Sequence, residues 1–474
     1  MDASWGLTID ERLYRTLMEH LFPGDRDEHG AVMAAGIVST VRGTRLLARE
    51  LFKAEDGVDF VPGRRGYRML TPEFVGDRIR FCRDQGLIYL AIHNHGGHDQ
   101  VEFSDPDNRS HERGYPALLD ISGRAVGALV FAEGAVAGDI WTPDRARRAI
   151  RETVIVGRNI ARLYPVPPPR PPEVDPTYDR QARWFGDRGQ ALLAGLKVGV
   201  IGAGGVGLPL VAMLARVGVG TMVVIDPDRV DPTSLARLDA RRIDAMMPLR
   251  RVRFLSRIAD RMSTRKVRLA RRISQRANPR IKFVTIPSSV VEPEAAMALI
   301  DCDFLFLAAD SHHARMVFNA IVHQFLIPGI QIGTRIDTDK KTGAVGDIRS
   351  NVRLVLPYSG CLRCNQLISP VRLQDESRSR ADRDRNRYVD EVPAASVITF
   401  NTMSASQAAS DFMLMIGELI DESAPTDYLR IRPRERKMEP VKALPNQPDC
   451  RDCGVGGGSR RGRGVGDELP LPDR

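Results

Sequence analysis

The sequence predicts an α/β protein of two domains, and three observations lead to this expectation. At 474 residues the chain is too long for one ordinary hydrophobic core. Residues 164–176, "YPVPPPRPPEVDP", contain too many prolines for a helix interior or a central strand, so they predict a semi-rigid linker. Hydrophobic runs typical of strands occur with helical patterns on both sides of this linker. We therefore expect one domain at 1–163 and a second at 177–453.

The elements follow from local patterns. Residues 30–41, "GAVMAAGIVSTV", and 86–95, "GLIYLAIHNH", predict strands, and residues 71–86 predict a helix between them. After the linker the pattern changes to a strand, a glycine-rich turn and a helix. Residues 454–474 contain almost nothing to bury and predict a disordered tail, with an RGG-like nucleic-acid tail as the lesser alternative.

Composition excludes several classes of protein. No stretch of about 18 apolar residues occurs, so we expect no membrane span, and the acidic, amphipathic start is not a signal peptide. These features predict a cytoplasmic protein. The net charge is +9, and only 8 of the 69 basic residues are lysine. The arginines are interleaved with acidic residues, as in "DESRSRADRDRNRYVDE", which favours a solvated surface over a nucleic-acid site.

The stretch "HNHGGHDQVEFSDPD" (93–107) has the chemistry of a metal site. His93 and His95 end an apolar strand, and residues i and i+2 of a strand face the same side. Asp107 would add a carboxylate three residues after Ser104. Three such ligands leave a fourth position for water, which is the geometry of a catalytic zinc. The alternative is a polar loop with solvated histidines, and His98 is expected to be such a bystander.

This stretch resembles the JAMM (JAB/Mov34) metallopeptidases, whose pattern is His-x-His-Pro, seven residues, then Ser-x-x-Asp. The present chain keeps the spacing and has Gly96 in place of the proline. The resemblance implies an α/β metallopeptidase domain that hydrolyses peptide or isopeptide bonds after a ubiquitin-like carboxyl terminus. It also implies that a glutamate ahead of the first strand acts as general base. Glu28 is the best match, and Glu19 and Glu50 are weaker candidates. Ser104 is expected to stabilise the oxyanion.

The second domain opens with "LKVGVIGAGGVGLPLVAMLARVGVGTMVVIDPD", a strand, a glycine turn, a helix and a second strand that ends in an acid. Such a turn lets the backbone approach phosphate at a helix amino terminus. The pattern suits NAD, FAD or ATP, so an NAD-dependent oxidoreductase is the first alternative. The residues expected to contact the nucleotide here are Gly202, Gly204, Gly205, Gly207 and Asp226.

From about residue 175 to residue 453 the chain resembles the ThiF/MoeB family and the adenylation domains of ubiquitin-activating enzymes. "YDRQARWFGDRGQALLAGLKV" resembles the entry segment, and "DPDRVDPTSLARL" the family's Asp-x-Asp…Asn-Leu-x-Arg run, with Ser234 in place of the asparagine. The resemblance implies a Rossmann-like adenylation domain that uses ATP and Mg²⁺ and forms a homodimer. The site residues that it implies are Arg180, reaching the partner subunit's nucleotide, Asp226 on the ribose, Arg237 and Lys266 on phosphates, and Asp310 positioning Mg²⁺. The gap between Arg237 and Lys266 implies a local insertion.

The cysteines predict a second metal site. Cys361 and Cys364, with Cys450 and Cys453, form a C-x-x-C…C-x-x-C set whose four thiolates would bind a structural zinc and leave no open position. A redox pair is the alternative. Cys82 and Cys302 remain, and they favour small core residues. Ubiquitin-activating enzymes carry a catalytic cysteine after the first pair, where this chain has none. We therefore expect an acyl-adenylate but no thioester on this chain.

Together the motifs predict a bifunctional enzyme. It would adenylate a ubiquitin-like protein that ends in glycine, for transfer to a conjugating enzyme's cysteine, and it would hydrolyse bonds after the same protein. Hydrolysis could trim a precursor or remove conjugates. The alternatives are activation of a sulfur-carrier protein and a scaffold that binds a ubiquitin-like protein with an inactive peptidase domain. The pairing of domains resembles bacterial ubiquitin-like conjugation systems, some of which act in phage defence.

Overall fold

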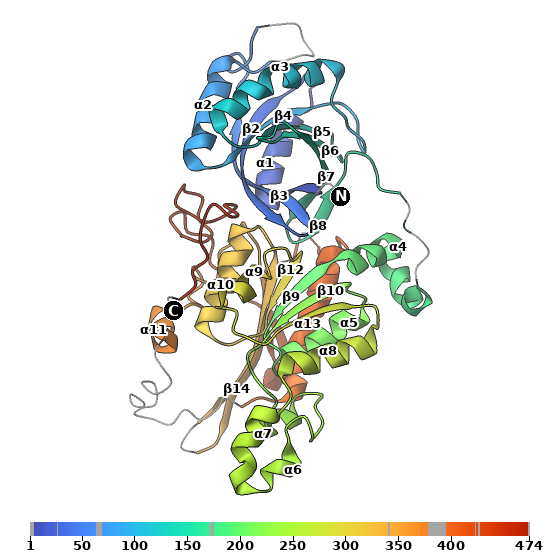
Figure 1. Cartoon of the computed structure of the whole chain (residues 1–474), viewed down its shortest axis with the longest axis vertical. Helices are drawn as coiled ribbons and strands as arrows, with labels where there is room; N and C mark the ends of the chain where they lie inside the picture. Colours follow the sequence, from blue (N-terminus) through green and yellow to red (C-terminus); the bar gives the residue numbers. More distant parts are fainter. Residues whose placement is uncertain are drawn as a thin grey trace. The chain divides into compact units, whose positions relative to one another are not determined.

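The computed structural model describes residues 4–25, 27–62, 69–169, 171, 175–339, 342–377, 395–421, 423–424 and 427–472. The chain forms two compact units. The first comprises residues 1–170 together with 323–326 and 454–468, and the second comprises residues 171–322, 327–453 and 469–474. The division between 170 and 171 falls within the proline-rich segment 164–176. Each unit is shown in Figure 1.

The first unit is a mixed sheet with three helices. Its elements are β1 (Trp5–Asp10), α1 (Glu11–Leu21), β2 (Gly30–Thr40), β3 (Gly43–Lys53), α2 (Pro72–Gln85), β4 (Ile88–Asn94), α3 (Asp105–Ser122), β5 (Val126–Phe131), β6 (Val136–Trp141), β7 (Arg147–Val156) and β8 (Ile160–Leu163). The strands predicted at 30–41 and 86–95 and the helix predicted at 71–86 are confirmed as β2, β4 and α2.

The sheet of the first unit is strongly curved and has a core on each face. Its strand order is β1-β3-β2-β4-β5-β6-β7-β8, and β1 also pairs with β7, so the sheet curls back on itself. Successive residues of a strand point to opposite faces. In β2, Met33 and Ala35 share a core with Leu17 of α1 on the inside of the curve. Val32 and Ala34 share the other core with side chains of α2 and α3, which cover the outer face (Figure 1).

The carboxyl-terminal segment corrects one prediction. Residues 454–468, expected to be disordered, pack within the first unit. Arg461 is 9% exposed and its Nη1 donates to the Asp10 carboxylate at 2.7 Å. The guanidinium of Arg49, 2% exposed, donates to the main-chain carbonyl of Arg461, and Gly464 forms a bridge with Ile37 of β2. The prediction from composition was wrong because buried arginines hold this segment through hydrogen bonds to distant residues, and not because the segment buries apolar side chains.

The second unit contains the remaining elements. They are η1 (Pro176–Tyr178), α4 (Asp179–Gly195), β9 (Lys197–Ile201), α5 (Gly207–Arg216), β10 (Thr221–Ile225), η2 (Pro232–Ala236), α6 (Met247–Arg250), η3 (Arg253–Leu255), α7 (Ser256–Met262), α8 (Lys266–Ala277), β11 (Lys282–Ile286), α9 (Pro293–Met297), β12 (Phe304–Leu307), α10 (His312–Gln324), β13 (Gly329–Thr338), β14 (Val345–Val355), α11 (Pro370–Ser377), α13 (Ile398–Ile416), β15 (Tyr428–Arg432), η4 (Pro433–Glu435) and β16 (Lys437–Pro440). The segment between Arg237 and Lys266, where an insertion is expected, contains α6, η3 and α7.

The sheet of the second unit places a ligand site at its centre. Its order is β11-β10-β9-β12-β13-β14-β15-β16, and the first five strands are parallel. The central strands β9, β10 and β12 are mostly apolar and buried because helices cover both faces, with α9 and α10 on one side and α5, α8 and α13 on the other (Figure 1). The strand order reverses between β9 and β12, and ligands of such sheets bind at the carboxyl ends of the strands at this switch point.

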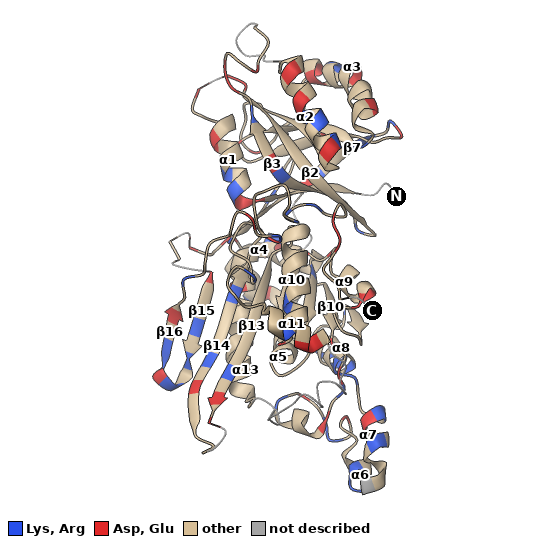
Figure 2. Ribbon diagram, turned by 90° about the vertical axis from the view of Figure 1, so that its left-hand side faces the viewer, with Lys and Arg blue, Asp and Glu red and all other residues tan. Residues whose placement is uncertain are grey.

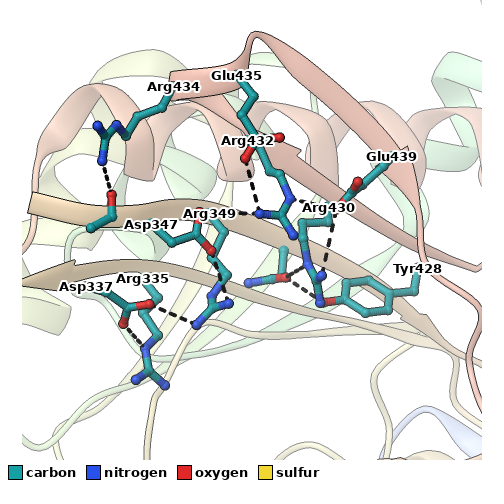
Figure 3. A network of polar contacts seen from close by, with 12 residues as sticks. Arg335, Asp337, Asp347, Arg349, Tyr428, Arg430, Arg432, Arg434, Glu435 and Glu439 are labelled. Carbon is teal, nitrogen blue, oxygen red and sulfur yellow. Dashed lines mark hydrogen bonds and ion pairs between the residues drawn. The ribbon is translucent and has the colours of Figure 1, made fainter.

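The antiparallel strands β13–β16 carry a network of paired charges on one face. Arg349 donates to Asp337 at 3.0 Å, and Arg432 donates to Glu439 at 2.7 Å (Figure 3). The Tyr428 hydroxyl receives a hydrogen bond from Arg430 at 3.0 Å. Figure 2 shows basic and acidic residues on the same strands β14–β16. On this face the arginines that give the chain its positive charge are therefore largely neutralised by neighbouring acids.

Candidate functional sites

The first unit brings the predicted metal ligands together. Ligand atoms of His93, His95 and Asp107 all lie within 4.8 Å of one another. The two Nε2 atoms are 3.2 Å apart, and Asp107 Oδ2 lies 3.5 Å from His93 Nε2 and 3.4 Å from His95 Nε2. A metal with ligand distances of about 2.0–2.2 Å could be held by three atoms spaced in this way. The three side chains are half-buried, so the cluster remains open to a substrate.

Local geometry at the start of α3 fixes Asp107. Ser104 is the N-cap residue, and its hydroxyl and main-chain N–H both donate to Asp107 Oδ2, at 2.6 and 2.9 Å. Burial disfavours the Asp107 carboxylate, but hydrogen bonds from His93, His95 and Ser104 outweigh it and hold the pKa of Asp107 well below its usual range. The Ser-x-x-Asp spacing is thus that of a helix capping box, and it aims the carboxylate oxygen at the two imidazoles.

Glu28 lies beside this cluster through the pairing of β2 with β4. Gly30 is paired with His93, and the next main-chain N–H, that of His29, donates to Asn94 Oδ1 at 2.6 Å. Glu28 comes two residues before Gly30, and so lies near the end of β4 that carries the two histidines. Its charge contributes to a raised pKa of His95, whose first cause is the hydrogen bond with Asp107.

The other polar candidates of the first unit lie elsewhere. Glu19 is exposed on α1, and Glu50 is paired with Ala34 further along β2, so Glu28 has the most favourable position of the three glutamates. His98 is exposed and pairs with Glu133 at 3.0 Å, away from the ligands. A Cβ atom at Gly96 would meet nothing within 4 Å, so the missing proline removes no packing contact.

The second unit has its glycine loop at the switch point of the sheet. Gly202 ends β9 with a φ of +98°, a conformation that favours glycine, and α5 begins at Gly207. A Cβ atom at Gly207 would lie 1.9 Å from the carbonyl oxygen of Gly202, so no side chain fits. At Gly205 it would lie 2.4 Å from Asn401 Nδ2, whereas at Gly204 nothing lies within 4 Å. The loop is therefore packed on its inner side and open at Gly204, as a phosphate cradle requires.

Two acids and a lysine lie next to this loop. Asp226 follows β10, is 6% exposed, and accepts hydrogen bonds from the main-chain N–H of Ala203 at 2.7 Å and of Asp228 at 2.8 Å. Lys266 is 9% exposed at the start of α8, and its Nζ donates to Asp228 at 2.7 Å. Burial raises the pKa of Asp226, and the positive charge of Lys266 opposes this effect. The sequence predicted Asp226 and Lys266, but it did not identify Asp228 as the partner that holds the lysine.

The remaining predicted residues have different environments. Arg237 is half-buried at the end of η2, where Ser234 forms a capping box with Asp231. Asp310 is exposed just after β12, at the carboxyl edge of the sheet. Arg180 is exposed on the first turn of α4, a position compatible with reaching a partner subunit.

A cavity that the sequence did not indicate lies close to the same edge. It has a volume of about 600 Å³ and is lined by residues from the end of β11 to the start of α9, namely Ile286, Ser288, Ser289, Glu292, Pro293 and Glu294. The main-chain N–H of Asp226 donates to the carbonyl of Ile286 at 3.2 Å, which joins this cavity to the acid beside the glycine loop. Nothing in the spacing of these lining residues distinguishes them from an ordinary loop, so sequence reasoning could not find them.

The four cysteines expected to bind zinc form one buried cluster. Sγ–Sγ distances are 3.7 Å for Cys361–Cys364, 3.7 Å for Cys361–Cys450 and 3.5 Å for Cys364–Cys453. Tetrahedral zinc with Zn–S bonds of about 2.3 Å needs sulfurs roughly 3.8 Å apart, so the cluster fits that metal. The six cysteines are all free thiols, and Cys82 and Cys302 are buried apart from the cluster.

A polar scaffold supports the cysteine cluster. Buried Asn319 of α10 donates to Asp452 at 2.9 Å and accepts from the main-chain N–H of Leu362 at 2.8 Å. Arg363 also donates to Asp452, at 3.1 Å. One side chain of α10 thus joins the two C-x-x-C loops, which are distant in the sequence. Neither Asn319 nor Asp452 was predicted, although Asp452 lies inside the second C-x-x-C motif.

The parallel sheet, the glycine loop at its switch point and the acid after the second strand define an α/β nucleotide-binding protein. The ThiF family matches residues 178–452, which is more than half of the chain. The chain belongs to the ThiF family, and its second unit is a Rossmann-like adenylation domain of the ThiF/MoeB type. The match leaves residues 1–177 outside it.

Several curated proteins are similar to this chain. The SAMP-activating enzyme E1 of Haloferax volcanii is 24% identical over 272 residues, which are 57% of this chain and 85% of that protein. The adenylyltransferase and sulfurtransferase UBA4 of Meyerozyma guilliermondii is 30% identical over 139 residues, 29% of each protein. The adenylyltransferase and sulfurtransferase MOCS3 of Mus musculus is 39% identical over 79 residues, 15% of this chain and 17% of that one.

Solved structures of MccB from E. coli also resemble this chain. The structure with ATP has a TM-score of 0.42 and 20% identity and covers 59% of this chain and 75% of that one. The complex with N-formylated MccA has a TM-score of 0.45 and 19% identity, with 59% and 75% covered. This likeness concerns the fold alone.

Among the described residues, no helix combines the length and apolar character that crossing a membrane requires.

Proposed function

We propose that the second unit activates the carboxyl terminus of a ubiquitin-like protein by adenylation with ATP. One observation carries this proposal. Lys266 is a buried lysine that donates to Asp228, and its charge acts on Asp226, the acid beside the glycine loop. A buried cation at this position can offset negative charge that moves between phosphate groups during adenylation. The name of the Haloferax relative, an activating enzyme, agrees with this assignment.

Each residue has a role in the reaction. The substrate's terminal carboxylate oxygen attacks the α-phosphorus of ATP, a new P–O bond forms, and the bond to pyrophosphate breaks. Main-chain N–H groups of the glycine loop would cradle phosphate, and Asp226 would bind ribose hydroxyls. Lys266 and Arg237, with Arg180 of a second copy, would offset the charge that moves to pyrophosphate. Asp310, a hard oxygen ligand at the strand edge, would position Mg²⁺.

The activated tail would leave without a thioester on this chain. Both cysteines outside the cluster are buried at 0% exposure. Burial raises the pKa of Cys82 to about 12, which suppresses its nucleophilic thiolate. Transfer would go to the cysteine of a conjugating partner. A second candidate acceptor is sulfur, because two relatives are named adenylyltransferase and sulfurtransferase.

For the first unit we propose hydrolysis of peptide or isopeptide bonds after the same ubiquitin-like protein. His93, His95 and Asp107 would hold zinc, which acts as a Lewis acid and lowers the pKa of water when bound. Glu28 would accept the proton of the attacking water, and the Ser104 hydroxyl, which donates to Asp107 in this structure, would turn to donate to the oxyanion. The spacing of the three ligand side chains and the electrostatic effect of Glu28 on His95 support this proposal.

ATP–pyrophosphate exchange tests the adenylation step. The full chain is assayed with a panel of ubiquitin-like proteins that end in Gly-Gly, and exchange must depend on one of them. Asp310→Ala is expected to lower the exchange rate by about 10²–10³-fold, because it removes the ligand that would position Mg²⁺ to offset the charge of the transition state. Asp187→Ala, which removes an exposed acid of α4, is the matched control and should exchange as wild type does. Nicotinamide binding without exchange would refute the proposal.

A further inference from the structure

The structure holds a buried polar hub close to the first-unit metal site. Asp139 of β6 is 7% exposed, and its carboxylate accepts four hydrogen bonds. The donors are His111 Nδ1 at 3.0 Å, Trp141 Nε1 at 3.1 Å, and Arg147 through Nη2 at 2.8 Å and Nε at 3.1 Å. Burying a carboxylate costs free energy unless it is paired with hydrogen-bond donors. The four hydrogen bonds to Asp139 compensate for this cost and fix the positions of the three donor side chains.

Two of the side chains bonded to Asp139, which we call the arms of the hub, connect it with α3, the helix that carries Asp107: His111 and Arg147. His111 is 6% exposed and lies one turn after Asp107 on α3. Arg147 Nη2 also donates to Asn108 Oδ1 at 3.0 Å, and Asn108 Nδ2 donates to the carbonyl of Ser104 at 3.1 Å. The first two turns of α3 are therefore tied to β6 through His111 and to β7 through Asn108, both of which follow Asp107.

A chain of ring contacts connects the hub with the histidine ligands. The His111 ring stacks on Tyr115, with centroids 4.7 Å apart and 11° between the planes. Its other contact is the edge of Phe103 at 4.9 Å, and Phe103 in turn lies 6.0 Å from the His93 ring. The hub thus constrains both sources of metal ligands, the end of β4 and the start of α3.

We infer that Asp139 is a positioning residue for the metal site: through His111, Arg147 and Asn108 it sets where the Asp107 carboxylate meets the two imidazoles. This inference rests on the proposed zinc site of the first unit. Outer partners of metal ligands commonly change metal affinity by about 10–100-fold when they are removed. Asp139 touches neither the metal ligands nor the reacting atoms, so its effect is expected on affinity and geometry.

The test compares zinc affinity in Asp139→Asn and wild-type full-length protein, by competition with a chromophoric chelator. We expect the first-unit site of Asp139→Asn to bind zinc about 10-fold more weakly, the lower end of that range, because Asp139 acts through His111 and Arg147 and not directly on a ligand. The four-cysteine site should be unchanged. Glu152→Gln is the matched control, because Glu152 is a hydrogen-bond hub of the same unit, accepting from Arg162 and Tyr164 at 2.8 Å each, without an arm to α3.

Asn108→Ala provides a second variant should Asp139→Asn fail to fold, because it cuts one arm and leaves the hub intact. It should weaken zinc binding in the same direction but less. Equal affinity in wild type, Asp139→Asn and Asn108→Ala would overturn the inference and leave the zinc site standing. Wild-type protein that binds zinc only at the four cysteines would overturn the proposed hydrolytic site, and the inference with it.

Discussion

At the scale of single residues, the two candidate sites depend on side chains whose freedom is removed by a neighbour. Asp107 is held by the Ser104 cap, and Lys266 is held by Asp228. Two glycines of the loop differ in the space around them. A Cβ atom at Gly204 would have no neighbour within 4 Å, whereas a Cβ atom at Gly207 would clash with the main chain. The two glycines therefore have different tasks: the first leaves space for a ligand, and the second allows α5 to begin directly under the loop.

Alanine substitutions at these two glycines should separate binding from folding. In Gly207→Ala the new Cβ would lie 1.9 Å from a carbonyl oxygen, so the thermal midpoint of the second unit should fall and ATP binding should be lost. In Gly204→Ala nothing lies within 4 Å, so the midpoint should stay while ATP binding weakens. Calorimetric titration with ATP and Mg²⁺, together with thermal melts, checks both. Wild-type affinity in Gly204→Ala would show that phosphate does not approach there.

At the scale of elements, local motifs were predictable and long-range ones were not. The histidine pair and the Ser-x-x-Asp run are set by strand alternation and helix capping, which act over a few residues. The Asp139 hub joins β6, β7 and α3 through side chains that no sequence spacing relates. The packing of residues 454–468 could not be predicted for the same reason. Arg461 of this segment bonds Asp10, which lies near the other end of the chain.

Removing the carboxyl-terminal segment should destabilise the first unit. Truncation after Cys453 leaves Asp10, 0% exposed, without Arg461, and leaves the buried Arg49 without its carbonyl acceptors. Breaking a buried pair by removing one partner costs about 3–5 kcal/mol. Hydrogen exchange of β1–β3 should accelerate, and Arg461→Ala should act in the same direction. Truncation after Glu468 keeps these contacts and should exchange as the full chain does; equal protection after either cut would contradict this role.

At the scale of the whole molecule, the chain carries two units with different sets of candidate metal ligands. The ThiF family membership of residues 178–452 accounts for the adenylation domain, and its buried cysteine cluster fits a structural zinc. The first unit gathers a different, more open donor set from two imidazoles and a carboxylate. We propose that one chain holds both a closed and an open zinc site, and so joins activation of a ubiquitin-like tail to hydrolysis after it.

Zinc per chain, measured by elemental mass spectrometry, tests this claim most directly. Wild-type protein is expected to hold two zinc ions, and His93→Ala/His95→Ala is expected to hold one, since only the open site loses its ligands. His98→Ala, which changes an exposed histidine paired with Glu133, should retain two. A single zinc in wild type that survives the double substitution would contradict the account and leave the first unit without hydrolytic chemistry.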